Sequence, residues 1–226
     1  MYNLQAVIRR GINNSNIQFE RLGNVGQNFA NFGTTGYKNV RFEQFLTEDG
    51  SVTGTKRTDC SQGALRITNN PYDVAIKGAG YIPVVSEDGQ VAYTRDGSFK
   101  LGKDGYLVTS DDWLVGSGIQ IPSNVHDFQI KRNGDVMVQD SKQSLPRKIG
   151  NIPLVQFASP EGLAEKGHNK LVQTEDSGEP KLIRNHDFIH QNNVETANVD
   201  LYGEVNTMLR LNASMLAHMQ LMKVAY

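Results

Sequence analysis

The sequence has one cysteine, Cys60, so no disulfide can form within the chain. No run approaches the roughly 20 consecutive apolar residues of a membrane-spanning helix, and the first residues show no apolar core of a cleaved signal peptide. Neither charge is in excess, since 23 Lys and Arg stand against 24 Asp and Glu. We therefore expect no membrane insertion, and no binding of nucleic acid, because basic patches are also missing.

Motifs for catalysis and metal binding are equally scarce. Cys60 has no neighbouring His to activate its thiol. The glycines of Gly78–Gly80 lack the third glycine and the following helix of a dinucleotide-binding loop. His186 and His190 are four residues apart, but the Glu of a zinc protease motif is absent. The carboxylates of Asp111–Asp112 would point apart on a strand. We expect no catalytic residue, no metal site and no cofactor.

Apolar residues at helical spacing occupy both ends of the chain. Steps of four and three predict a C-terminal helix that begins near Asn198 or Asp200. Its apolar seam consists of Leu201, Val205, Met208, Asn212, Met215, Met219 and Met222. A looser stripe predicts an N-terminal helix from about Leu4 to about Asn31. That stripe consists of Leu4, Ile8, Ile12, Phe19, Leu22 and Phe29.

The C-terminal seam has the features of an assembly surface. Methionine is adaptable and common on surfaces that must repack. Asn212 interrupts the seam, and a buried polar residue at such a position sets register and partner number in coiled coils. The seam also continues to the last residue, Tyr226, without a stop signal. The alternative is that both helices pack only within their own chain.

Between the ends, short apolar runs alternate with turn dipeptides. Asp88-Gly89, Asp96-Gly97, Asp104-Gly105 and Asn133-Gly134 predict type I′ hairpin turns. The ten strands that they separate extend from Asp73 to Phe157 and include Ile119–Ile121. Strands at this spacing are typical of an antiparallel barrel or sandwich.

The sequence thus predicts an α+β protein. Its N- and C-terminal helices form a discontinuous, coiled-coil-like module, and an antiparallel β barrel or sandwich is inserted between them. We expect the terminal module at residues 1–46 and 193–226 and a linker at 47–63. The β-rich domain is expected at 64–166 and a return connection at 167–192.

Several motifs resemble those of bacterial flagellar rod and hook proteins, in the same order. Residues 27–38 are similar to the N-terminal pattern Asn-Asn-Ile-Ala-Asn-x-x-Thr-x-Gly-(Tyr/Phe)-Lys. Residues 93–99, Tyr-Thr-Arg-Asp-Gly-Ser-Phe, resemble the most distinctive run of the family, and residues 194–200 resemble Glu-x-Ser-Asn-Val-Asp at the start of the C-terminal helix. The matching positions are Asn28, Ala30, Asn31, Thr35, Gly36, Tyr37, Lys38, Tyr93, Thr94, Arg95, Gly97, Phe99, Asn198, Val199 and Asp200.

The resemblance implies a non-enzymatic subunit of the flagellar basal-body rod, a drive shaft that transmits torque across the periplasm. Such subunits leave the cytoplasm through the flagellar type III export apparatus without a cleaved signal and stack helically. The implied partners are further copies, other rod and hook axial proteins, the export apparatus and the surrounding ring proteins. Because the linker before Ser61 is short, the sequence favours the proximal-side rod protein. A distal-rod subunit is the alternative.

A different class of function is a periplasmic β-domain that binds a glycan or a small ligand. Sugar sites use exposed aromatic rings, which Trp113 with Tyr81, Tyr93 and Tyr106 could supply. The helices would then serve only to pack the domain.

Overall fold

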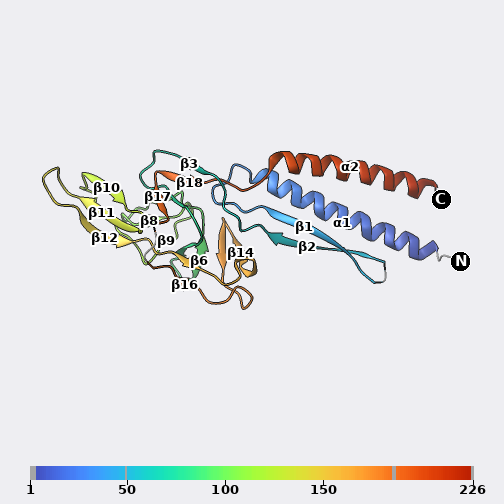
Figure 1. Cartoon of the computed structure of the whole chain (residues 1–226), viewed down its shortest axis with the longest axis horizontal. Coiled ribbons are helices and arrows are strands. Elements are labelled where there is room, and N and C mark those ends of the chain that lie inside the picture. Colours follow the sequence, from blue (N-terminus) through green and yellow to red (C-terminus); the bar gives the residue numbers. More distant parts are fainter. Residues whose placement is uncertain (1–3, 49, 185–186, 225–226) are drawn as a thin grey trace. The chain divides into compact units, whose positions relative to one another are not determined.

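The computed structural model describes residues 4–48, 50–184 and 187–224 (Figure 1). The chain forms two compact units. The terminal unit comprises Met1–Gly33, Lys38–Asp59 and Asn198–Tyr226, and the central unit comprises Thr34–Tyr37 and Cys60–Ala197. Helices from both ends of the chain contact each other in the terminal unit, and the central unit is built from antiparallel sheets. The α+β prediction is confirmed.

Two helices, α1 (Leu4–Ala30) and α2 (Leu201–Val224), lie side by side in the terminal unit (Figure 1). α2 begins directly after Asp200, whose carbonyl accepts the backbone N–H of Glu204 at 2.9 Å. α1 contains three glycines, and each is up to about 1 kcal/mol less favourable in a helix than alanine. Packing of α1 against its neighbours must therefore supply much of its stability.

A hairpin in the terminal unit occupies part of the expected linker. β1 (Val40–Leu46) pairs antiparallel with β2 (Val52–Thr58) along their full lengths, and both strands contact α1. β2 is polar and mostly exposed, so it carries none of the apolar alternation by which strands are recognised. Pairing with β1 holds it instead. The linker expected over residues 47–63 is therefore in part a strand.

The central unit contains sixteen short strands within its described residues. The first eight are β3 (Leu65–Ile67), β4 (Val74–Ile76), β5 (Ile82–Val85), β6 (Val91–Thr94), β7 (Lys100–Leu101), β8 (Leu107–Val108), β9 (Leu114–Val115) and β10 (Asp127–Ile130). The others are β11 (Asp135–Gln139), β12 (Arg147–Asn151), β13 (Val155–Gln156), β14 (Ala164–Gly167), β15 (Lys170–Val172), β16 (Lys181–Leu182), β17 (Ile189–Gln191) and β18 (Asn193–Glu195). A 3₁₀ turn, η1, covers Pro160–Gly162.

Seven strands form the largest sheet, in the order β14-β15-β6-β5-β9-β8-β7. The remaining strands form a three-stranded sheet, β10-β11-β12, and the pairs β13-β16, β17-β4 and β18-β3. Their apolar side chains make one main core, in which the largest fully buried members are Ile76, Ile82, Leu107, Ile119, Ile152, Leu154 and Ile189.

Three of the four predicted turns do join paired strands, but with a different loop. At Asp88–Gly89 the Ser86 N–H donates to the Gln90 carbonyl at 2.9 Å, and only the glycine of the loop has a positive φ, 78°. The loops at Asp104–Gly105 and Asn133–Gly134 repeat this pattern. A three-residue loop of this kind combines a type I turn with a left-handed glycine. The type I′ prediction was wrong at these positions.

The fourth turn, Asp96–Gly97, joins strands that do not pair, because β6 pairs with β5 and β15, whereas β7 pairs with β8. Two consecutive positive φ angles, 48° and 53°, occur instead at His168 and Asn169 in the two-residue loop between β14 and β15. That loop has the backbone signs of a type I′ turn. It lies in the expected return connection, where β15, β16 and β17 also form. Ile119–Ile121 makes only an isolated bridge, through Gln120 to Tyr106.

Candidate assembly surface

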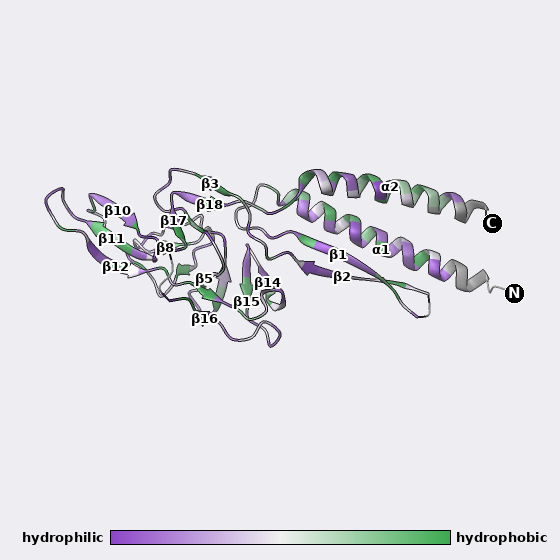
Figure 2. Cartoon of the chain, viewed as in Figure 1, coloured by the Kyte–Doolittle hydropathy of each residue, from purple (hydrophilic) through white to green (hydrophobic). Residues whose placement is uncertain are grey.

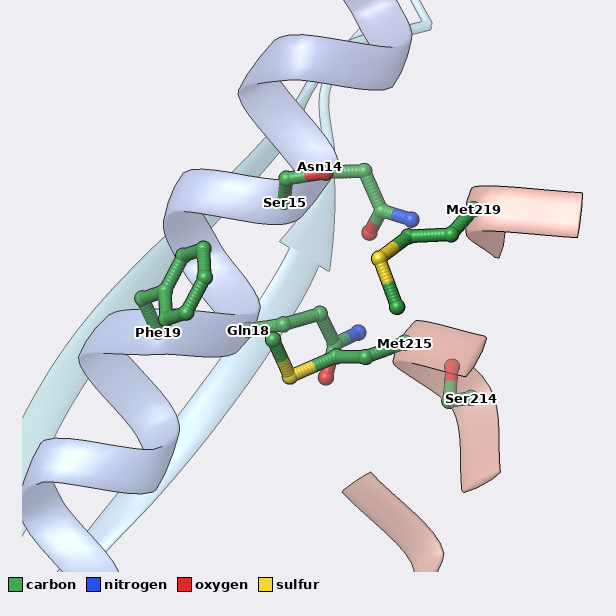
Figure 3. Close-up of a pocket in the computed structure, with 7 residues that line it drawn as sticks. All are labelled: Asn14, Ser15, Gln18, Phe19, Ser214, Met215 and Met219. Atoms are coloured by element: carbon green, nitrogen blue, oxygen red, sulfur yellow. The ribbon is translucent and has the colours of Figure 1, made fainter. Parts of the chain in front are cut away.

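The two helices contact each other within the chain along a line next to the predicted seam. On α2, Leu211 is 3% exposed and buried in the helix contact, whereas the adjacent Asn212 is exposed. Among the α1 side chains from Arg9 onward, whose burial is described, the buried apolar ones are Ile17 and Val25. A pocket of about 110 Å³ lies between the helices, and Figure 3 shows Met215 and Met219 of α2 extending toward α1. Asn212 is therefore not buried in the contact within the chain.

Among the predicted seam residues, Phe19, Met215 and Met219 line this pocket. Of those predicted on α2, the half-buried ones are Leu201, Val205 and Met215, and the exposed ones are Met208, Asn212 and Met219. On α1, Leu22 is half-buried, and the exposed ones are Ile12, Phe19 and Phe29. The side chains of Leu4, Ile8 and Met222 lie outside the described residues, as does Tyr226.

A further apolar face of α2 was missed by the sequence analysis. Leu209 and Leu216 are 58% and 57% exposed, and Tyr202 precedes Leu209 by the same seven residues. Residues seven apart share a face of a helix, whereas Leu211, two residues beyond Leu209, lies roughly 200° around it. α1 thus covers only one side of the apolar surface of α2. Figure 2 shows hydrophobic residues recurring along the length of α2.

Two motif asparagines hold the terminal unit together. The amide of Asn28, which is fully buried, bonds to both backbone groups of Val40 and to the carboxylate of Glu204. Asn198 accepts the backbone N–H of Asn39 at 2.6 Å and donates to the Asp59 carbonyl at 2.9 Å. These contacts explain why amide side chains occupy both motif positions.

Burial is the main cause that raises the pKa of Glu204 above its ordinary value of 4.5. The nearby charge of Asp200 acts in the same direction, while the hydrogen bond from Asn28 and the charge of Arg21 oppose it. The protonation of this carboxylate, where α1 meets α2, therefore makes the stability of the terminal unit depend on pH.

Two motifs distant in sequence meet in the central unit. The Thr35 hydroxyl donates to the carboxylate of Asp96 at 2.7 Å and lies 3.1 Å from the Ser98 hydroxyl. Gly36 has φ 69°, and a Cβ there would lie 2.5 Å from the backbone nitrogen of Asp96. A side chain is therefore excluded at Gly36. In the same way, a Cβ at Gly97 would lie 1.7 Å from the carbonyl oxygen of Val74.

Arg95 and Glu195 form a buried ion pair in the central unit. Nε of Arg95 donates to Oε2 of Glu195 at 2.8 Å, and the two side chains are 5% and 0% exposed. The remaining guanidinium donors reach the backbone carbonyls of Gly78 at 3.0 Å and Gly80 at 2.7 Å. The motif arginine thus has carboxylate and carbonyl partners on every side of its planar group.

The remaining motif residues have structural surroundings. Tyr93 packs against Phe157 with ring centroids 4.8 Å apart, and the Thr94 hydroxyl donates to the Asn169 carbonyl at 2.9 Å. Asn31 donates to the Gln27 carbonyl at the end of α1. The buried ones are Tyr37, Lys38, Phe99 and Val199, and Ala30 is exposed.

The aromatic residues of the glycan hypothesis do not form an exposed face. Tyr81 and Tyr93 are buried, and burial, followed by the neighbouring Cys60 thiol, raises the pKa of Tyr81. The ring of Trp113 is half-buried and carries the ammonium of Lys170 5.1 Å from its centroid. Tyr106 is half-buried as well, so none of the four rings is exposed.

The two described polar residues that were considered as candidate sites, Asp111 and His190, have charged neighbours. The carboxylate of Asp111 lies 2.5 Å from the buried ammonium of Lys170. Burial alone would raise its pKa, but the hydrogen bonds from Lys170 and Thr109 outweigh it and hold the pKa below 3.8. Burial and the charges of Arg132 and Lys77 lower the pKa of His190.

His186, the other histidine of this pair, lies outside the described residues. Within the parts that the structure describes, no three His, Cys, Asp or Glu side chains gather where they could hold a metal ion. Among the same residues, no helix has the length and apolar character needed to cross a membrane.

Comparison with known proteins gives the family. The family model described as flagellar hook protein FlgE/F/G D1 domain matches residues 75–138. The flagellar basal-body rod protein FlgG of Buchnera aphidicola subsp. Baizongia pistaciae is 31% identical over 214 residues, which cover 82% of each chain. FlgG of Caulobacter vibrioides is equally similar, with 31% identity and 82% of each chain covered.

The flagellar hook protein FlgE of Brucella abortus is 36% identical over 126 residues, which cover 51% of this chain and 32% of FlgE. The matched family is one of structural, non-enzymatic proteins of the flagellar rod and hook. The chain belongs to the flagellar basal-body rod protein family, together with the related hook proteins. The preference for the proximal-side rod protein finds no support here, because the rod relatives named are FlgG.

Proposed function

We propose that the chain is a FlgG-type subunit of the flagellar rod and assembles with copies of itself through its terminal helices into the axial shaft. The observation that carries this proposal is the similarity to FlgG rod proteins over 82% of both chains. The exposed apolar faces of α1 and α2 supply the physical means of assembly.

Burial of these faces between copies would drive polymerisation. Phe19 of α1 and Leu209 and Leu216 of α2 are each more than half exposed in the single chain. Burying one such side chain contributes about 1.5–3 kcal/mol. Several contacts per subunit would exceed the entropy of fixing the helix ends. If the face on α1 of one copy packs against the face on α2 of the next, the contact is heterologous, the kind that produces open helical filaments.

The FlgG relatives support a distal rather than a proximal position in the rod. In this reading the subunit also contacts other rod and hook axial proteins and, at its outer side, the ring proteins. Export through the flagellar type III apparatus without a cleaved signal is part of the same proposal. All these partners follow from family membership.

The proposal is tested by locating the protein in purified basal bodies. An epitope inserted beside Leu145, which is 89% exposed in the loop between β11 and β12, should leave the fold intact because exposed loops tolerate insertions. Immunogold particles are expected over the rod, toward its hook side. Particles confined to the part next to the inner membrane would refute the distal position. A motile tagged strain whose purified basal bodies carry no particles would refute the rod assignment.

A further inference from the structure

The chain passes between its two units through three short segments of the central unit: Thr34–Tyr37, residues 60–63 and residues 195–197. We propose that the buried Arg95–Glu195 ion pair is a clamp that fixes these three connecting segments against one another. The proposal rests on contacts within the central unit.

Glu195 binds the other two segments directly. Its backbone carbonyl accepts the N–H of Gly36 at 2.8 Å, and its Oε1 accepts the N–H of Gly63 at 2.9 Å. Glu195 itself belongs to the third segment, and the N–H of the next residue, Thr196, donates to the Ala64 carbonyl at 2.8 Å. One residue therefore touches every segment by which the chain enters or leaves the central unit.

Arg95 anchors Glu195 to the body of the sheet. Its guanidinium bridges Oε2 of Glu195 and the carbonyls of Gly78 and Gly80 in the turn between β4 and β5. Gln62, in the second segment, binds the same turn, because its Oε1 accepts the Gly78 N–H at 2.9 Å. The clamp thus has a fixed side in the β4–β5 turn and a side that holds the connecting segments.

The Arg95–Glu195 ion pair is better suited to fixing the directions of the connecting segments than to stabilising the central unit. A buried ion pair gains little over well-packed apolar side chains, because both charges lose their water. The planar guanidinium, however, offers donors in fixed directions. The ion pair joins Arg95 to Glu195, which lies 100 positions further along the sequence. Apolar packing at this point would not fix the directions of the connecting segments.

The consequence for the rod rests on the function proposed above. If the terminal helices form the shaft, force carried along the chain to the central unit passes through the three connecting segments. The clamp then keeps this connection stiff. The existence of the clamp can be tested on the purified monomer, without any assumption about the rod.

Amide hydrogen exchange on the purified full chain tests the clamp. In E195Q, which removes the charge but keeps the side-chain shape, the amides of Gly36 and Gly63 are expected to exchange about tenfold faster, while the core amide of Val84 changes less than about twofold. The matched control is D111N, which neutralises another carboxylate paired with a buried cation at a position outside the connecting segments. It should leave Gly36 and Gly63 unchanged.

Three results would overturn the clamp. The first is unchanged exchange at Gly36 and Gly63 in E195Q, and the second is an equal effect of D111N. The third is loss of protection at Val84 together with the glycines, because the ion pair would then hold the whole unit. R95K is a second test variant, because its ammonium cannot reach Glu195 and both carbonyls at once. It should accelerate the exchange of Gly36 and Gly63 as E195Q does.

The two proposals can fail separately. If exchange shows the clamp but the tagged protein is absent from basal bodies, the rod assignment fails and the clamp stands. If the protein lies in the rod but exchange at Gly36 and Gly63 is unaffected by E195Q, only the clamp fails.

Discussion

The side chain of Asn28 bonds to both backbone polar groups of Val40. Its Oδ1 accepts the Val40 N–H at 3.0 Å, and its Nδ2 donates to the Val40 carbonyl at 2.9 Å. The same Nδ2 donates to Oε1 of Glu204 at 2.8 Å. One buried amide therefore connects α1, the β1–β2 hairpin and α2, and its removal should be felt throughout the terminal unit.

The variant N28A tests this connection. It leaves the buried N–H of Val40 without its acceptor, which we expect to lower the free energy of unfolding of the terminal unit by about 2 kcal/mol. Chemical denaturation followed by helical circular dichroism measures the change. The control is N31A, which removes an exposed hydrogen bond to the Gln27 carbonyl. It should lower the free energy of unfolding by less than about 0.5 kcal/mol. Equal effects of the two variants would contradict the account.

The pKa of Glu204 gives a prediction for pH. Because this pKa is raised above 4.5 in the folded chain, the native state holds the proton more tightly than the unfolded state. The resulting stabilisation is complete below pH 4.5 and is lost as pH rises through the folded pKa. E204Q cannot ionise, so its stability relative to wild type should increase between about pH 4 and about pH 7. The measurement is thermal unfolding of the helices of wild type and E204Q at both pH values. A stability difference between the two proteins that is the same at both pH values would contradict the prediction.

The sequence predicted what depends on local pattern. Both helices, the beginning of α2 after Asp200 and many strands follow from apolar period and turn residues. β2 was missed because it is polar and depends on its partner strand, which no local pattern reports. The Asp-Gly loops were assigned the wrong turn type because the dipeptide fixes the left-handed glycine, whereas the preceding Asp can adopt either sign of φ.

Substitution of Gly36 tests the contact between the two distant motifs. G89A introduces a Cβ at φ 78° into open space, so it reports the cost of the backbone conformation alone, about 1–2 kcal/mol. G36A adds a close approach to the Asp96 backbone, and overcrowding of this kind typically costs about a further 2 kcal/mol. Thermal melts of the central unit should rank wild type above G89A and G89A above G36A. The reverse ranking of the two variants would disprove the contact.

The pocket between α1 and α2 offers a stabilising change. Oε1 of Gln18 is buried beside Met215 without a hydrogen-bond partner in the described part of the chain. Q18L removes this unpaired acceptor and adds apolar contact, so we expect the terminal unit to gain about 1 kcal/mol. Denaturant titration of the monomer would show it. A loss of stability would mean that Gln18 is satisfied in solution.

The assembly surface was only partly predictable because a helical period gives a stripe but not the neighbour that covers it. The seam around Asn212 and the buried Leu211 differ by one residue, about 100° around the helix. The broad apolar surface of α2 permits both registers, and the position of α1 selects one of them. The exposed face that contains Leu209 was missed because the seam residues by themselves already satisfy the helical period.

Electron microscopy of basal bodies from a strain that lacks the gene and carries a variant copy tests the central claim most directly. L209D places a charge on the exposed apolar face of α2, and L209M keeps an apolar side chain of similar size at the same position. Neither should change the stability of the monomer by more than about 0.5 kcal/mol. Wild type and L209M are expected to build full-length rods, whereas L209D and the empty strain should build truncated rods or none. Full-length rods in the empty strain, or with L209D, would contradict assembly through this face.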